Sequence, residues 1–439
     1  EMAGGGLPEA RVRVMQDAAG SPLIGQAIIK PYAVGTSQLV LAPVAFTARN
    51  DGATQVTTRI DVSGPLGDGR VESLRLPIVA TWDGGSRLTV NATCAPLGFA
   101  RLRLSGIDLR RSSMTLCPRD GGLARLERGV LRGGGGIGPI RLAGTLGASP
   151  LELVMRQAQW SLEDRRFVLA GLGVRVGTAE RITRLDVARL AGAFAANRPQ
   201  GSFDGAAGQI GSVPLLLSAA NGNWRFAEGK LSLAGGLAVA DSAASPRFHP
   251  MAVRGAAVTL ADNHIVATGT LFEPKQGVKV ADVTIAHDLG TGTGRADLIV
   301  PGITFDEHFQ PDHLTPLTFG VIANVVGATS GEGHIRWTPQ AVTSDGVFRT
   351  GGINLAAAFG PASGIAGEIR FTDLLNLESA PGQVATIKSL NPGVAVNDGV
   401  VRYQLLPGAR VRVEQGVWPF AGGRLSLEPT LLDFDEAQE

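Results

Sequence analysis

Long apolar runs are missing from this sequence. No stretch reaches about 18 consecutive apolar residues, the length that a membrane-spanning helix needs. No basic start followed by an apolar stretch is present, so no signal peptide is recognised. Because the first residue is Glu1, we expect the sequence to begin inside a longer product or after processing, with any membrane anchor upstream of it.

An excess of charge of one sign is also missing. The 439 residues include 40 Lys and Arg against 39 Asp and Glu, which gives a net charge of +1. A protein that follows a phosphate backbone needs a basic surface. Nucleic acid is therefore not expected as a partner.

Cysteine is scarce, with only Cys94 and Cys117 in the chain. A bond between them would close a loop of about 23 residues and contribute roughly 3 kcal/mol in the chain-entropy model. The even number, the short separation and the hairpin-like sequence between them favour a disulfide in an oxidising compartment. Two buried free thiols in a reducing compartment are the alternative.

Signals for catalysis are absent too. The sequence has no Gly-x-Ser-x-Gly elbow and no Gly-Lys-Ser/Thr phosphate loop. Residues 133–138 (GGGGIG) match a dinucleotide-binding pattern in letters, but strand-like residues follow instead of a helix, so we interpret them as a flexible turn. His308 and His313 lie among acidic residues around Pro311, where a solvated loop is favoured over a metal site. We expect no enzyme, no catalytic or metal-binding residues and no cofactor.

Aliphatic residues, glycine and proline are abundant. Hydrophobic residues make up 44% of the chain and aromatic residues 5%, with 60 Gly and 25 Pro spread along it. Glycine and proline at this frequency favour many short strands joined by turns over long helices. Apolar and polar residues alternate with period two in residues 74–78, 101–104, 231–233, 278–280, 369–371, 411–413 and 425–427. After Gly106 the phase of the alternation changes, which we interpret as a bulge.

Turn signals separate these segments and predict roughly 25 strands joined as hairpins. They lie at residues 83–85, 221–223, 228–230, 345–346, 397–399 and 422–423. Four hairpins share a Trp before the turn: Trp160 to Leu169, Trp224 to Leu233, Trp337 to Phe348 and Trp418 to Leu427. Their irregular spacing excludes a fixed-period repeat. Helix is expected to be scarce: residues 372–377 are assigned one short helical turn, and residues 184–195 fit a helix or a strand.

The predicted fold class is mainly β with very little helix: an elongated, twisted antiparallel sheet curled into a U-shaped groove with an apolar interior. A long two-faced sheet must otherwise close on itself or form a sandwich to cover its aliphatic face. Pro and charged residues cluster at residues 306–316, so we place a soft boundary near residue 300: residues 1–300 form an extended β-groove segment and residues 301–439 a C-terminal β domain. The groove-lining candidates are Leu102, Leu104, Leu231, Leu233, Leu237, Val239, Val278, Val280, Ile369, Phe371, Val411 and Val413.

A family resemblance rests on a string of short motifs in one order. They are 286–292 (AHDLGTG), 300–305 (VPGITF), 313–317 (HLTPL), 364–367 (GIAG), 371–375 (FTDLL), 390–393 (LNPG), 396–399 (VNDG) and 416–423 (GVWPFAGG). Residues 286–434 resemble the C-terminal, "dicarboxylate transport"-labelled domain of the YdbH family, AsmA-like and TamB-like bridge proteins for intermembrane phospholipid transport. No dicarboxylate site is visible in these residues.

The resemblance implies a passive conduit in the periplasm of a bacterium with two membranes. Phospholipid acyl chains would slide along the groove, and bound phospholipid is the one ligand that the resemblance implies. An N-terminal segment outside this sequence would anchor the protein in the inner membrane. It also implies that a small outer-membrane lipoprotein adds a strand to the C-terminal edge, for which Leu425, Leu427 and Leu431 are the candidate residues. The alternative function is a structural or adhesive envelope β-protein with a dry core and no lipid.

Overall fold

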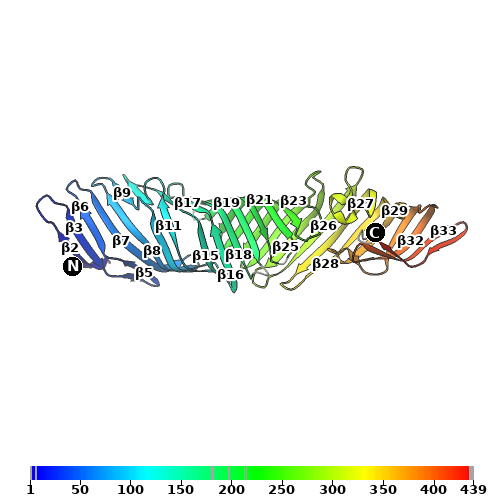
Figure 1. Ribbon diagram of the computed structural model, residues 1–439, viewed down its shortest axis with the longest axis horizontal. Coiled ribbons are helices and arrows are strands. Elements are labelled where there is room, and N and C mark those ends of the chain that lie inside the picture. Colours follow the sequence, from blue (N-terminus) through cyan, green and yellow to red (C-terminus); the bar gives the residue numbers. More distant parts are fainter. Residues whose placement is uncertain are drawn as a thin grey trace. The chain divides into compact units, whose positions relative to one another are not determined.

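The computed structural model describes residues 2–4, 7–178, 182–195, 198–211, 213 and 215–434. The chain divides into two compact units, residues 1–211 and residues 212–439. Both units are built from antiparallel strands, and in each unit these follow one another roughly in chain order (Figure 1). The predicted mainly β fold class is therefore confirmed.

Unit 1 is an antiparallel sheet of twenty described strands. Their bounds are β1 Met2–Gly4, β2 Leu7–Met15, β3 Leu23–Ile29, β4 Tyr32–Val34, β5 Ser37–Leu41, β6 Val44–Ala48, β7 Thr54–Leu66, β8 Gly69–Trp82, β9 Arg87–Val90, β10 Ala95–Leu104, β11 Ile107–Pro118, β12 Ala124–Glu127, β13 Val130–Arg132, β14 Gly134–Ile137, β15 Ile140–Leu146, β16 Ser149–Met155, β17 Gln157–Ser161, β18 Arg166–Val176, β19 Thr183–Ala195 and β20 Arg198–Gln209. The ambiguous residues 184–195 thus belong to a strand.

Unit 2 has fifteen described strands and two short 3-10 turns, η2 and η3. Their bounds are β21 Leu215–Ala227, β22 Lys230–Asp241, β23 Met251–Ala261, β24 His264–Phe272, β25 Lys279–Asp288, β26 Thr293–Phe305, η2 Pro311–His313, η3 Pro316–Thr318, β27 Ile322–Trp337, β28 Val342–Ala357, β29 Gly360–Asp373, β30 Glu378–Ser379, β31 Gln383–Leu390, β32 Val396–Leu406, β33 Arg410–Phe420, β34 Gly423–Leu427 and β35 Thr430–Asp433. From β21 to β29 most strands are 10 to 16 residues long.

The strands outnumber the prediction because several neighbours of a long strand are broken in two. β7 pairs with both β5 and β6, β11 with β14 and β15, and β33 with β34 and β35. The breaks include Pro43, Pro139 and Pro429. Proline has no N–H to donate, so it interrupts the ladder where it stands.

Kinks also lie inside the strands. Left-handed backbone, with φ between 49° and 62°, occurs in mid-strand at Ser73, Gly171, Gly255, Asn324 and Gly364. Register shifts accompany several of them, for example between Arg254 and Ala257. Bulges of this kind bend a strand and increase its twist. They explain how the long strands of each unit can curl.

Three predicted turns proved wrong, since residues 221–223, 345–346 and 397–399 lie inside β21, β28 and β32. The prediction of a flexible turn at residues 133–138 is also wrong, because Gly134–Ile137 is strand β14. The phase change near Gly106 is the hairpin turn between β10 and β11, not a bulge. The four Trp-containing hairpins are confirmed as β17–β18, β21–β22, β27–β28 and β33–β34.

Large side chains stack on glycines of the neighbouring strand. A Cβ at Gly135 would lie 2.3 Å from the Trp160 ring, and one at Gly294 would lie 2.4 Å from the Trp337 ring. Trp418 covers Gly399 in the same way, and Leu374 covers Gly346. These glycines sit in strands because a neighbour fills the space that their own side chain would take.

Cys94 and Cys117 are joined by a disulfide bond. Cys94 lies in the break between β9 and β10, and Cys117 lies near the end of β11, the strand paired with β10. At the same break the Asn91 amide accepts a hydrogen bond from the Val79 N–H and donates one to the Pro77 carbonyl. The disulfide and Asn91 together hold the sheet where its ladder is interrupted.

The soft boundary near residue 300 falls inside β26, and the division into residues 1–300 and 301–439 stays a prediction. Residues 374–377 form a turn after β29 and not the expected helical turn. Among the described residues, no helix has the length and apolar character required to cross a bilayer.

Candidate functional site: an apolar sheet face and the loops that meet over it

One face of the unit 2 sheet is apolar. Cross-strand register places Val283 beside Leu298, and Ile369 beside Phe348. The buried core of this face consists of Val280, Ala281, Val300, Ile303, Phe305, Phe309 and Val325, with further half-buried aliphatic residues packed against it. These side chains pack against one another as one cluster on the sheet. We call this side the apolar face.

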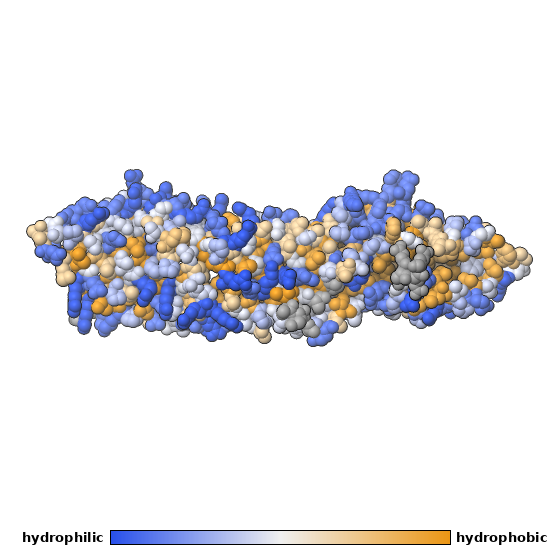
Figure 2. Space-filling view, viewed as in Figure 1, coloured by the Kyte–Doolittle hydropathy of each residue, from blue (hydrophilic) through white to orange (hydrophobic). Residues whose placement is uncertain are grey.

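Unit 1 has an apolar face of the same kind. Leu102 pairs with Leu109 and with Val71, and Leu153 pairs with Val174. The buried residues of this cluster are Val71, Phe99, Leu109 and Leu151. Figure 2 shows hydrophobic residues along the middle of each unit in this view, with hydrophilic residues toward the margins.

The opposite, polar face of each sheet carries cross-strand ion pairs. In unit 1 the Arg141 guanidinium bonds Glu152, and in unit 2 Arg349 bonds Glu368 at 3.0 Å. These side chains are exposed, so each pair contributes little to stability.

The predicted groove-lining residues are spread over both apolar faces. Leu102 packs in the unit 1 cluster, whereas Leu104, at the hairpin, is 38% exposed. Val278 and Val280 meet in the unit 2 core, and Phe371 contacts the ring of Phe348. Leu231, Leu233, Leu237 and Val239 lie half-buried along β22, Ile369 along β29 and Val411 along β33, while Val413 is buried. Whether each touches lipid stays a prediction.

Much of the apolar surface remains accessible to solvent. The chain exposes 25102 Å², whereas two separate compact globules, each of half its mass, would together expose about 19,000 Å². Only two of the twelve candidates, Val280 and Val413, are buried, and each of them is 8% exposed. The other ten candidates are half-buried or exposed, so part of each remains accessible to solvent.

A loop between β26 and β27 folds onto the apolar face of unit 2. Phe309 is 3% exposed and stacks on Phe305, with ring centroids 5.8 Å apart. The Gln310 amide accepts a hydrogen bond from the Val325 N–H and donates one to the Val325 carbonyl. The sequence predicted a solvated surface loop here, but Phe309 instead anchors it on the sheet.

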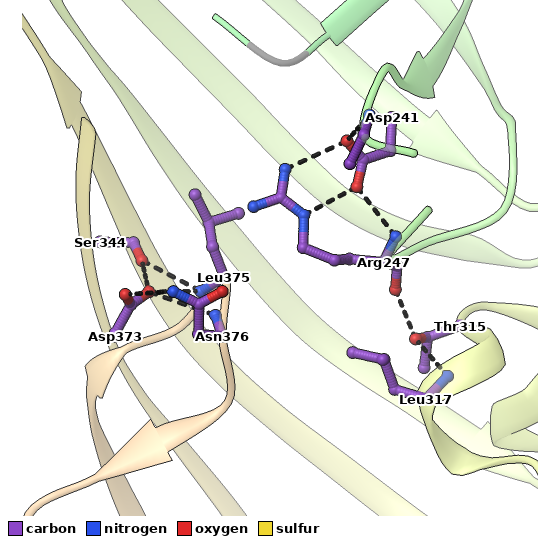
Figure 3. A network of polar contacts seen from close by, with 9 residues as sticks. Asp241, Arg247, Thr315, Leu317, Ser344, Asp373, Leu375 and Asn376 are labelled. Carbon is purple, nitrogen blue, oxygen red and sulfur yellow. Dashed lines mark hydrogen bonds and ion pairs between the residues drawn. The ribbon is translucent and has the colours of Figure 1, made fainter. Parts of the chain in front are cut away.

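A second loop, between β22 and β23, lies against the first. Asp241, at the end of β22, is buried, and the Arg247 guanidinium donates two hydrogen bonds to its carboxylate (Figure 3). Burial raises the pKa of Asp241, but hydrogen bonds from the side chain and backbone of Arg247 and from the Ala243 N–H outweigh it and lower the pKa to about 2. Thr315 bonds the Arg247 carbonyl, which ties the two loops together.

A third loop follows β29. The Asp373 carboxylate accepts hydrogen bonds from Ser344 Oγ, at 2.7 Å, and from the N–H groups of Leu375 and Asn376. In Figure 3 Leu375 points from this turn toward Arg247. The Asp373 charge is among the causes that raise the pKa of Arg247, so the two groups lie within electrostatic reach. Sequence reasoning missed this meeting of loops, because residues 241, 247 and 373 carry no motif.

The C-terminal edge of unit 2 is formed by β34 and β35, which both pair with β33. Within residues 215–434 no further strand pairs with their outer edge. Leu425, Leu427 and Leu431 are 43%, 41% and 52% exposed. Their contact with a partner strand stays a prediction.

The remaining sequence candidates gather in no site. His308 and His313 lie around η2, and the described residues contain no group of three His, Cys, Asp or Glu side chains arranged to hold a metal ion. His287 is buried beside Trp337, whose Nε1 donates to His287 Nδ1 at 3.1 Å, and burial lowers the pKa of this histidine. That pairing is structural.

Comparison with known proteins gives one match. A family model described as "YdbH-like: Intermembrane phospholipid transport protein YdbH" matches residues 7–439, a longer stretch than the residues 286–434 that carry the sequence motifs. No curated protein matches. No solved structure matches either. The chain therefore belongs to the YdbH-like family of intermembrane phospholipid transport proteins.

Proposed function

We propose that each apolar face is a passive path for phospholipid acyl chains between the inner and outer membranes. The observation that carries this proposal is the aliphatic face that each unit leaves accessible. Burial of apolar surface stabilises a bound acyl chain by about 25 cal/mol per Å². An aliphatic face without a specific head-group pocket would let a bound chain slide along it without a large barrier.

Lipid analysis of the purified protein is the first test. Phospholipid extracted and identified by mass spectrometry should be present in at least equimolar amount. Its absence would support the alternative function, a structural or adhesive envelope protein without lipid.

A matched pair of variants on β22 tests the apolar face itself. Leu233 pairs with Trp224 and Val258, whereas its neighbour Ser232 pairs with Arg225 and Thr259 on the polar face. A carboxylate on the apolar face would have to be desolvated by each passing acyl chain. We expect Leu233→Asp to reduce phospholipid transfer between donor and acceptor vesicles about tenfold, and Ser232→Asp to leave it unchanged. Equal transfer by both variants would count against the apolar path.

We propose further that the β34–β35 edge receives a strand from a small outer-membrane lipoprotein. The support is its free outer edge within the described residues and the exposure of Leu425, Leu427 and Leu431. Successive N–H groups of a strand point to opposite edges. Of the single variants Ser426→Pro and Leu427→Pro, one removes an outward N–H and the other removes an N–H directed at β33. We expect the first to abolish co-purification of the lipoprotein and to keep the melting temperature. We expect the second to lower the melting temperature.

A periplasmic location, with an inner-membrane anchor that precedes this sequence, completes the proposal. Its support is the family and the disulfide between Cys94 and Cys117, which suits an oxidising compartment. Labelling of introduced cysteines by a membrane-impermeant thiol reagent in intact spheroplasts tests it. Labelling only after lysis would contradict it.

A further inference from the structure

The loops drawn in Figure 3 come from opposite rims of the unit 2 sheet. Because β22 to β29 are successive antiparallel strands, the ends of β22 and β26 lie on one rim and the end of β29 on the other. A straight strand of the 14 residues of β29 would span about 46 Å from rim to rim. In Figure 3 Leu375, from the Asp373 turn on the other rim, nevertheless points toward Arg247, and the Asp373 charge acts on the Arg247 guanidinium. The curled sheet thus brings its two rims together at this point.

We call the two meeting parts the Arg247 bridge: residues 242–250 with Thr315 and Leu317 on one rim, and residues 373–376 on the other. Each part is held firmly within its own rim. Asp241 and the Thr315 hydroxyl fix Arg247 on one side, and Ser344 fixes Asp373 on the other. In the part of the chain that the structure describes, no hydrogen bond or ion pair joins the two sides. The two halves therefore approach each other without a direct polar bond between them.

The Arg247 guanidinium is only partly used. Its Nε and Nη2 bond Asp241, and no described residue hydrogen-bonds its Nη1. Arg247 therefore has a free N–H donor and faces an anion, Asp373, that is within electrostatic reach but makes no direct bond. A phosphate oxygen fits this position, because guanidinium N–H groups form strong charge-assisted hydrogen bonds to phosphate.

We propose that the Arg247 bridge is a selectivity gate, which a lipid phosphate opens by replacing Asp373 as the anion that faces Arg247. This inference rests on the proposed function, in which acyl chains lie on the apolar face and the head group stays at the open side. A head group that moves past β22 to β29 must cross the bridge. A phosphate offers Arg247 a closer partner than Asp373, since Ser344, Leu375 and Asn376 hold the Asp373 carboxylate in its turn. A lipid without phosphate, such as diacylglycerol, has no anion that could replace Asp373 near Arg247.

The first test compares the vesicle-to-vesicle transfer of labelled phosphatidylglycerol and labelled diacylglycerol by the full protein. The wild type should transfer phosphatidylglycerol about tenfold faster, which corresponds to about 1.4 kcal/mol. Asp373→Asn keeps the hydrogen-bonding shape of the turn and removes the charge, so the ratio of the two rates should fall to about one or two. The control is Asp345→Asn, whose carboxylate pairs with Arg336 on the polar face of the same strand region. Equal transfer of both lipids by the wild type, or an unchanged ratio in Asp373→Asn, overturns the gate.

A second measurement leaves the charged groups of the bridge in place. A bismaleimide cross-link in the double variant Leu317→Cys and Leu375→Cys joins the two rims covalently, while the disulfide between Cys94 and Cys117 stays unreactive. The cross-linked protein should keep its bound phospholipid and lose transfer relative to the same double variant labelled with a monofunctional maleimide, which leaves the two rims unjoined. Transfer through the cross-linked protein overturns the gate. Absence of bound phospholipid in the wild type would instead refute the proposed function itself.

Discussion

The Arg247 guanidinium donates hydrogen bonds to both carboxylate oxygens of Asp241, at 2.7 and 3.1 Å, and the Asp241 side chain is completely shielded from solvent. Removing the charge of a buried, paired carboxylate leaves its partner without compensation. Asp241→Asn should therefore destabilise unit 2 by about 2 to 4 kcal/mol in denaturant unfolding. Asp282→Asn, which removes an exposed pair with Lys279, should cost less than about 1 kcal/mol. An equal loss of stability in both variants would mean that the burial of Asp241 does not determine the cost of removing its charge.

The same pair makes the stability depend on pH. The pKa of Asp241 is lowered to about 2 in the folded protein, from an ordinary value of 3.8. Its contribution of about 2 kcal/mol is complete above pH 4 and is lost as the pH falls from 4 toward 2. The difference in unfolding free energy between the wild type and Asp241→Asn should be constant from pH 5 to 7 and should shrink below pH 4. A difference that stays constant down to pH 2 would contradict the assignment.

Phe309 should be the residue that holds the β26–β27 loop on the apolar face. It is 3% exposed, whereas Phe319 in the same loop is 72% exposed. Phe309→Ala should cost about 3 to 5 kcal/mol and increase hydrogen exchange across residues 306–314. Phe319→Ala should stay within about 0.5 kcal/mol of the wild type. A small effect of Phe309→Ala would show that the loop is held by its hydrogen bonds alone.

Gly294 should tolerate no side chain, because the Trp337 ring lies 2.4 Å from the position of its Cβ. Gly294→Ala must displace that ring and should lower the stability by about 1 to 3 kcal/mol. The hydrogen bond from Trp337 to His287 should weaken with it, and Trp fluorescence would report the change. Gly302→Ala in the same strand meets no atom within 4 Å, and its melting temperature should match that of the wild type.

The disulfide should contribute to unit 1 through the unfolded chain. Cys94→Ser together with Cys117→Ser opens a loop whose ends are 23 residues apart and should cost about 3 kcal/mol. The loss should appear in the unfolding of unit 1, with unit 2 unchanged. Reduction of the wild-type protein should reproduce the value; if it does not, the serines themselves disturb the break between β9 and β10.

Local pattern was sufficient wherever one strand and its turn determine the outcome. Alternation in residues 101–104 and 411–413 placed strands correctly, and Trp before a turn identified four hairpins. It failed at Gly222, Gly346 and Gly399, which it assigned to turns. Glycine permits a turn, but it equally permits the close approach of a neighbouring strand or of a side chain such as Trp418.

The sequence by itself determined a mainly β chain with two-faced strands, because period-two alternation and turn chemistry are local properties. It also carried the family motifs, which are patterns in the letters. Only the tertiary structure decided that Phe309 leaves its polar loop to pack on the sheet. It also brings Asp373 within electrostatic reach of the Asp241–Arg247 pair, although 132 residues separate Asp241 from Asp373. Such contacts depend on the curvature that bulges accumulate over eight successive strands, and no short stretch of sequence records that sum.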